Sequence, residues 1–366
     1  MIYDENRPAP GDCPMHIPDG YLSPSTCAVL YVGAATGWYS ALKRLKRVLL
    51  GRIIPLISVF AAFSFVVMMF NLPLPGGTTG HALGVTIAAI VLGPSGAILA
   101  LSIAITIQAL FFGDGGISTL GANCFNMAIV GSLLAYASYR LIAAGAALTS
   151  RRRVVAAAIA GYLAVNAAAL FAAVELGIQP MFFHDANGTP LYAPYRLGVA
   201  IPAMMIGHLT LAGFAEAAIS AGLVAYLQVA DPALLRSTSG IVADAPDAAL
   251  ATAARSLQTL WVAIAALMLF TPLGILAAGT AWGEWSPAEL ARATPHATPG
   301  MPPVPAGLQR LSTLWTAPFP AYAPSFVKSH AFGYLLSAMF GVGFLLAVSL
   351  VLRRLLDRQQ RGEHST

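Results

Sequence analysis

The sequence predicts an all-α polytopic membrane protein, and three observations support this fold class. Of the 366 residues, 57% are hydrophobic and only 10% are charged, whereas a soluble domain has about a quarter charged residues. The mean hydropathy is +0.73, and the apolar residues gather in runs of the length that crosses a bilayer as one helix. Lysine and arginine concentrate in alternate loops between these runs, as is typical of multi-pass membrane proteins.

About nine membrane passes are predicted, taken here in chain order. The third and fourth passes are separated only by Gly93-Pro94, because this pair interrupts a helix. Small-residue tracts at 156–158 and 167–169 allow helices to approach closely, where lipid gives no hydrophobic drive for association. The predicted passes are 22–42, 53–70, 81–93, 95–112, 121–144, 154–175, 199–228, 257–280 and 329–352.

The basic residues predict the orientation of these passes. With the N-terminus outside, 15 of the 20 Lys and Arg residues fall in segments on the inside, in four groups that lie between 43 and 52, 140 and 153, 236 and 255, and 353 and 361. This asymmetry follows the positive-inside rule. The N-terminus is therefore predicted outside and the C-terminus inside. The five basic residues predicted outside are Arg7, Arg196, Arg292, Arg310 and Lys328.

Composition divides the chain into four segments. Residues 1–14 form a polar extension, 15–228 a seven-helix membrane domain, and 229–256 a cytoplasmic linker rich in Ala, Asp and Pro. Residues 257–366 form a two-helix accessory domain, whose outside loop at 281–328 carries too many prolines for regular helix. The chain has no P-loop for a nucleotide, no secretory signal, and no basic face typical of nucleic-acid binding.

Two histidines are predicted at the outer ends of membrane passes. His16 lies in Met15-His16-Ile17-Pro18-Asp19-Gly20, at the start of the first pass. His81 follows the bent loop Pro75-Gly76-Gly77-Thr78-Thr79-Gly80. Two imidazoles on one membrane surface can chelate a late first-row divalent ion. Spacing alone leaves open that they are unrelated interfacial residues.

Further polar groups lie beside the passes or inside them. Asn123 and Asn126 start the fifth pass, where they can either cap a helix or support a ligand. His208 and Glu216 lie inside the apolar run 199–228, eight residues apart and so near one helix face. Intramembrane ionisable groups carry function or pair with other helices. We favour a structural hydrogen bond for His208, and both roles stay open for Glu216.

The remaining histidines and the cysteines suggest no second site. Cys13, Cys27 and Cys124 have neither zinc-site nor disulfide spacing. We expect Cys27 and Cys124 to be small apolar fillers of the core. The other histidines are expected in outside segments or, for the last, in the inner tail: His184, His296, His330 and His364.

Three motifs in this order resemble one family. They are Met15-His16-Ile17-Pro18-Asp19-Gly20, Pro75-Gly76-Gly77-Thr78-Thr79-Gly80-His81, and the stretch from Asp114-Gly115-Gly116 to Asn126-Met127. Residues 15–228 resemble the substrate-binding membrane component of cobalt/nickel energy-coupling-factor (ECF) transporters, the CbiM/NikM family. Residues 257–352 resemble the small accessory membrane subunit of these systems, by topology more than by motifs.

The resemblance implies a ligand set for the metal. In this family the ion is bound by the N-terminal amine, by the amide and imidazole of the next histidine, and by a later histidine. Carried over, these groups belong to Met15, His16 and His81, with Asp19, Asn123 and Asn126 as possible supporting residues. Four nitrogens in a plane suit Ni²⁺. Because the amine and amide must lose protons, binding is expected to weaken in acid.

The sequence departs from this pattern at one point, because Met15 is not residue 1. With residues 1–14 present, Pro14 acylates the nitrogen of Met15, and the site loses its amine donor. We expect translation to start at Met15. Two alternatives stay open: proteolytic removal of the extension, or retention of the extension with another donor such as Cys13.

The resemblance implies uptake of Ni²⁺ or Co²⁺ across the cytoplasmic membrane of a bacterium or archaeon. The chain would be a transport component with no enzymatic activity and no intrinsic cofactor, and the choice of metal stays open. It would need a transmembrane coupling (T) subunit and ATPase (A) subunits that hydrolyse ATP. One rival is an ion-coupled secondary transporter that uses Glu216 and His208. Another, an intramembrane metallohydrolase, lacks an HExxH helix pair.

Overall fold

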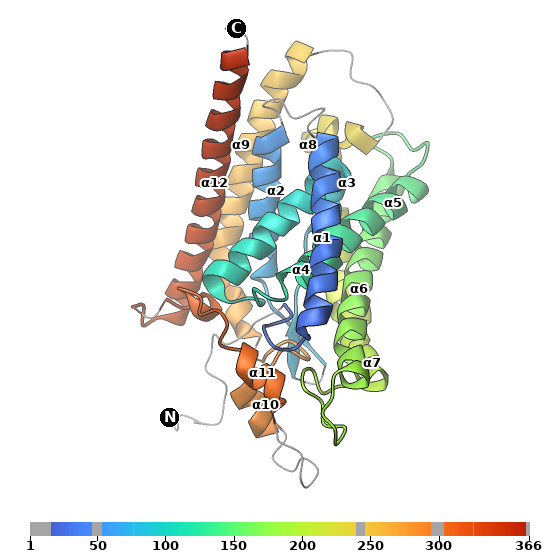
Figure 1. The fold of residues 1–366 in the computed structure, drawn as a ribbon. Coiled ribbons are helices and arrows are strands. Elements are labelled where there is room, and N and C mark those ends of the chain that lie inside the picture. The colour runs from blue at the N-terminus through green and yellow to red at the C-terminus, as the bar shows by residue number, and fades with distance from the viewer. Residues whose placement is uncertain are drawn as a thin grey trace, which may run out of the picture.

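The protein is described here by a computed structural model, which covers residues 16–45, 53–75, 77–238, 246–277, 279–293, 304–324 and 326–363. Long apolar helices form a bundle, and the only sheet among these residues is one two-stranded hairpin. Figure 1 shows α1 starting at the end of the bundle that also carries the short helices α10 and α11. We call this end the site end.

The first part of the chain supplies most of the bundle. The stretch from α4 to α5 is one continuous helix that contains a π-helical segment, η2, and the same is true of α7, η3 and α8. The helices of this first part are α1 (Pro24–Leu45), α2 (Ile53–Met68), α3 (Val85–Ile107) with η1 (Gln108–Phe112), α4 (Leu120–Asn123), η2 (Cys124–Val130), α5 (Gly131–Ile142), α6 (Arg151–Phe182), α7 (Leu197–Gly207), η3 (His208–Ala212), α8 (Gly213–Ala230) and η4 (Pro232–Thr238).

The last part of the chain packs on this bundle. Helices α9 and α12 both lie against α2, and the Tyr334 hydroxyl donates to the Met69 carbonyl at 3.0 Å. The contact is close, because a Cβ on Gly274 would lie 2.1 Å from the Met69 carbonyl oxygen. The elements of this last part are α9 (Pro246–Phe270), η5 (Thr271–Leu276), α10 (Pro287–Ala293), α11 (Ala306–Leu311), η6 (Pro320–Tyr322) and α12 (His330–Glu363).

The membrane helices agree with the predicted class of fold. Among the described residues, six helical stretches are long and apolar enough to cross a membrane, and Ile53–Met68 is a shorter apolar helix. Helix α1 has 22 residues and covers the first predicted pass. The protein is therefore a multi-pass helical membrane protein, while the count of nine passes and the orientation stay predictions.

The break predicted at Gly93-Pro94 is present. Gly93 has non-helical dihedral angles, with φ 72° and ψ 170°. His81, shortly before the Val85–Phe112 stretch, and Asp114, shortly after it, both contact His16, so the two ends of the stretch lie near the same residue. The chain therefore bends sharply at this break. The first arm, 85–92, rises only about 12 Å, so the predicted pass 81–93 is shorter than the roughly 30 Å hydrocarbon core of a bilayer.

Two other predicted segments differ from the structure. Helix α9 begins at Pro246, inside the segment 229–256 that was predicted as a linker. Proline at the start of a helix costs nothing, since the first N–H groups have no helical partner. The predicted irregular loop 281–328 likewise contains short helices, α10 and α11, and each starts at or directly after a proline.

Candidate metal-binding site

A β-hairpin delivers His81 to the site end. Strands β1 (Leu72–Leu74) and β2 (Thr78–Gly80) pair antiparallel, with Leu72 opposite Gly80. Gly77, in the predicted bend between the strands, has a positive φ of 77°. His81 follows β2 directly and precedes α3, so its backbone is held from both sides.

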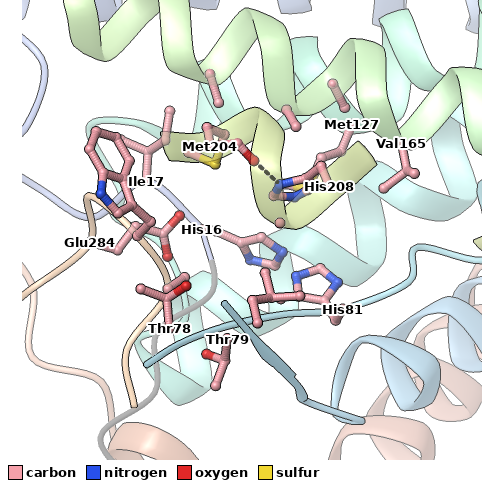
Figure 2. A pocket seen from close by; sticks show the side chains of 18 of the residues that line it. His16, Ile17, Thr78, Thr79, His81, Met127, Val165, Met204, His208 and Glu284 are labelled. Carbon is pink, nitrogen blue, oxygen red and sulfur yellow. Dashed lines mark hydrogen bonds between the residues drawn. The ribbon is translucent and has the colours of Figure 1, made fainter. Parts of the chain in front are cut away.

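The structure brings His16 and His81 together. Their ring centroids are 5.2 Å apart and the ring planes are nearly perpendicular, at 88°. The two residues are buried, with exposed fractions of 2% and 6%. Figure 2 shows both imidazoles at one cavity. The pairing that the sequence left open is therefore present.

Hydrogen bonds fix which nitrogen of each ring is free. His16 Nδ1 lies 3.3 Å from the Asp114 carbonyl oxygen and 3.4 Å from the Asp114 carboxylate. His81 Nδ1 lies 3.0 Å from the Ala82 carbonyl oxygen. Each Nδ1 therefore carries the proton, which leaves an Nε2 lone pair for a metal. His16 Nε2 is buried and has no hydrogen-bond partner among the described residues.

Electrostatics keep His81 neutral. Burial and, to a smaller extent, the neighbouring His16 lower the pKa of His81 to about 4. At neutral pH the His81 imidazole thus has an unprotonated nitrogen without any metal present. Such a ring is ready to bind a cation, because no proton must leave it first.

Glu216 supports His81 from within the membrane. Its carboxylate is fully buried and accepts from the backbone N–H groups of Leu83 at 2.8 Å and Gly84 at 2.9 Å. These two residues follow His81 at the start of α3, where N–H groups lack helical partners. Glu216 therefore joins α8 to the segment that carries His81. This geometry favours a structural role for Glu216, and its role in transport stays a prediction.

Asp19 and Asn123 hold the backbone around His16. Asn123 accepts from the N–H of Ile17 and donates to its carbonyl, both at 3.1 Å. Asp19 accepts from the backbone N–H of Ser118 at 2.7 Å and of Ile117 at 3.1 Å. Asp19 thus ties the His16 segment to the 113–119 loop, and Asn123 ties the same segment to α4.

The second asparagine pairs inside the bundle. Asn126 donates to Glu175 at 2.8 Å, and its own amide oxygen is buried without a partner among the described residues. Neither Asn123 nor Asn126 caps a helix, since the residue before α4 is Thr119. The capping alternative is thus not observed.

The cavity between the histidines has a volume of about 70 Å³ and is lined by residues from distant parts of the chain. His208 lines it, although its Nδ1 also lies 2.9 Å from the Met204 carbonyl oxygen, as expected for a structural role. Glu284 lines it as well, although nothing in its sequence context predicts this. A lone glutamate between Trp282 and Trp285 in a proline-rich loop has no distinctive spacing.

The other sequence-based expectations can be placed as follows. Cys27 and Cys124 are buried and free, as expected for core fillers. His184 and His330 are exposed. Met15, Cys13, His296 and His364 lie outside the described residues.

The described side chains alone do not complete a metal site. Among them, no group of three or more His, Cys, Asp and Glu residues could hold an ion. His16 and His81 supply two nitrogens, and further donors must come from the backbone or from residues beyond the described ranges. Paired imidazole nitrogens suit late first-row divalent ions. The fold and site thus define a membrane protein that handles a transition metal.

Comparison with known proteins identifies the family. Residues 16–234 match the family described as "Cobalt uptake substrate-specific transmembrane region", and residues 257–358 match the PDGLE domain. The first match covers more than half of the chain. The chain therefore belongs to this cobalt and nickel transport family, with a PDGLE region fused to its C-terminal side.

Individual relatives agree with this assignment. The chain is 54% identical to the fused nickel transport protein NikMN of Rhodobacter capsulatus, over 91% of this chain and 95% of that protein. It is 42% identical to the probable fused nickel transport protein LarMN of Lactiplantibacillus plantarum, over 75% and 79% of the two chains. A crystal structure of a transition metal transporter superposes with a TM-score of 0.55 at 51% identity, over 58% of this chain and 92% of that chain.

Proposed function

We propose that this protein captures Ni²⁺ or Co²⁺ as the substrate-binding component of an ATP-driven ECF transporter. One observation carries the proposal: two buried imidazoles, His16 and His81, meet at one cavity with their Nδ1 atoms already engaged. The relatives named as nickel transport proteins support the same substrate class.

Met15, His16 and His81 are the proposed ligands. The amine of Met15, the amide and imidazole of His16 and the imidazole of His81 make four nitrogens, and the fused chelate rings of the first three favour a planar set. The absence of a third side-chain ligand among the described residues is consistent with main-chain donors. Asp19 and Asn123 serve this set by fixing the His16 backbone, and Asn126 lines the same cavity.

The energy source lies in partner subunits. The chain contains no P-loop sequence, so ATP hydrolysis is assigned to A subunits coupled through a T subunit. The distribution of basic residues supports an orientation with the site end outside and the C-terminus in the cytoplasm, in the cytoplasmic membrane of a bacterium or archaeon. An ion enters at the histidine cavity and leaves on the opposite side.

An uptake assay tests this proposal. Cells that express the chain with its T and A subunits are expected to accumulate ⁶³Ni or ⁵⁷Co, and cells with a hydrolysis-deficient A subunit are not. Equal uptake in the two strains would instead favour the ion-coupled secondary transporter. Glu216 argues against that rival, because its carboxylate is occupied by the backbone of α3.

A further inference from the structure

Glu284 is a buried carboxylate that the ligand set above does not use. Its exposed fraction is 5%, and its Oε2 atom has no hydrogen-bond partner among the described residues. A carboxylate without a partner is costly to bury. It comes from the PDGLE region, yet it lines the same cavity as His16 and His81, as Figure 2 shows.

Contacts on both sides hold Glu284 in this place. Ala281 forms a β-bridge with Thr79 of strand β2, and the Thr79 hydroxyl donates to the Gly279 carbonyl at 3.0 Å. On the other side, the Tyr21 hydroxyl donates to the Trp285 carbonyl at 2.7 Å. The segment is thus tied to the two loops that carry His81 and His16.

A second cavity lies on the other side of Glu284. It has a volume of about 390 Å³ and is formed by the 113–116 loop of the first domain together with the α10, α11 and η6 region. Its described lining contains four carboxylates and no Lys, Arg or His: Asp19, Asp114, Glu284 and Glu289. We call it the acidic cavity. A cleft lined by one sign of charge raises the local concentration of the opposite ion.

Of these four carboxylates, only Glu284 lines both cavities. The other three carboxylates do not line the histidine cavity, and each already accepts hydrogen bonds. Asp19 accepts from Ser118, Asp114 accepts from Tyr322 at 2.7 Å, and Glu289 accepts from Thr280 and Ser286. A cation that leaves the acidic cavity for the histidines therefore meets one carboxylate with an unused oxygen.

We propose that Glu284 transfers the divalent cation from the acidic cavity to His16 and His81. The proposal rests on the proposed function and assigns the PDGLE region a direct part in metal loading. Burial and the nearby Asp114 raise the pKa of the Glu284 carboxyl well above its ordinary value. A partly hydrated Ni²⁺ or Co²⁺ therefore displaces the Glu284 proton to water as it exchanges one of its waters for the carboxylate, and it then exchanges that carboxylate for the imidazole nitrogens. Oxygen ligands bind such ions less tightly than nitrogen ligands do, so the ion moves on to the histidines.

Stopped-flow measurement of Ni²⁺ binding tests this role. The full chain in lipid nanodiscs is mixed with NiCl₂, and quenching of tryptophan fluorescence reports arrival, because Trp282 lines the histidine cavity. In E284Q the association rate constant is expected to fall by about tenfold or more, while the equilibrium Kd for Ni²⁺ changes by a smaller factor. E284D keeps the charge and is expected to stay within about threefold of the wild-type rate.

Glu289 gives the matched control, because it lines the acidic cavity but both its oxygens already accept hydrogen bonds. E289Q is expected to change the association rate by less than about twofold. The proposal is overturned by an unchanged rate in E284Q, by equal slowing in E289Q, or by an E284D as slow as E284Q. Wild-type protein that binds neither Ni²⁺ nor Co²⁺ would overturn the proposed function itself.

Discussion

Replacing Glu216 by alanine is expected to weaken the fold and the metal site through the same two hydrogen bonds. The substitution removes the acceptor for the N–H groups of Leu83 and Gly84, which stay buried. A buried donor left without a partner costs about 1–3 kcal/mol, so E216A should lower the free energy of unfolding by about 2–6 kcal/mol. The freed segment carries His81, and loss of such support lowers metal affinity by about 10- to 100-fold.

E216Q separates this structural role from proton transfer. A glutamine oxygen in the place of Oε2 can still accept from both N–H groups, so the loss of stability should be only about 1–2 kcal/mol. Metal affinity and uptake should then survive in E216Q. Equilibrium unfolding in mixed micelles, calorimetry with Ni²⁺ and ⁶³Ni uptake measure the three quantities. Abolished uptake in a stable E216Q protein that still binds metal would refute the reasoning and favour a proton relay.

Three further predictions follow from the site. The pKa of His81 lies at about 4, below its ordinary value of 6.5, so the unfolded chain binds more protons than the folded chain between these two pH values. The free energy of unfolding should therefore fall by about 3 kcal/mol from pH 6.5 to pH 4. In unfolding experiments at a series of pH values, H81A should lack this pH dependence. D114N removes the charge beside His16 Nδ1 and should weaken Ni²⁺ binding by about tenfold or more in calorimetry, whereas Y322F, which keeps Asp114, should weaken it less. The amine of Met15 is available only without residues 1–14, so mass spectrometry of membrane-purified protein should find peptides that begin at Met15; an abundant peptide that spans Arg7 to His16 would contradict this.

The pairing of His16 with His81 could be predicted from sequence because it depends on few facts. Each histidine stands next to a turn-rich motif at the start of an apolar run, and the parity of the runs places both at one membrane surface. The break at Gly93 was equally predictable, since a glycine-proline pair interrupts a helix. The start of α3 was not predictable, because it depends on a tertiary contact, in which Glu216 accepts from the Leu83 N–H.

The residues that escaped prediction depend on contacts between distant segments. Glu284 reaches the cavity only because α9 and α12 pack on α2 and the 279–281 segment pairs with strand β2. No local spacing encodes that arrangement. Asn123 looked like a helix cap from its place in the sequence, yet its side chain is taken up by the backbone of Ile17. A polar side chain at a helix start has several backbone groups within reach, and the tertiary fold decides among them.

The central claim is that His16 and His81 bind the transported ion, and calorimetry of Ni²⁺ and Co²⁺ binding to H81A tests it most directly. Loss of one of four nitrogen donors should lower the affinity by about 100-fold or more, with a helix content by circular dichroism equal to that of the wild type. H184A is the matched control, since His184 is exposed and lies outside the cavity lining. Unchanged affinity in folded H81A, or equal losses in H81A and H184A, would contradict the account.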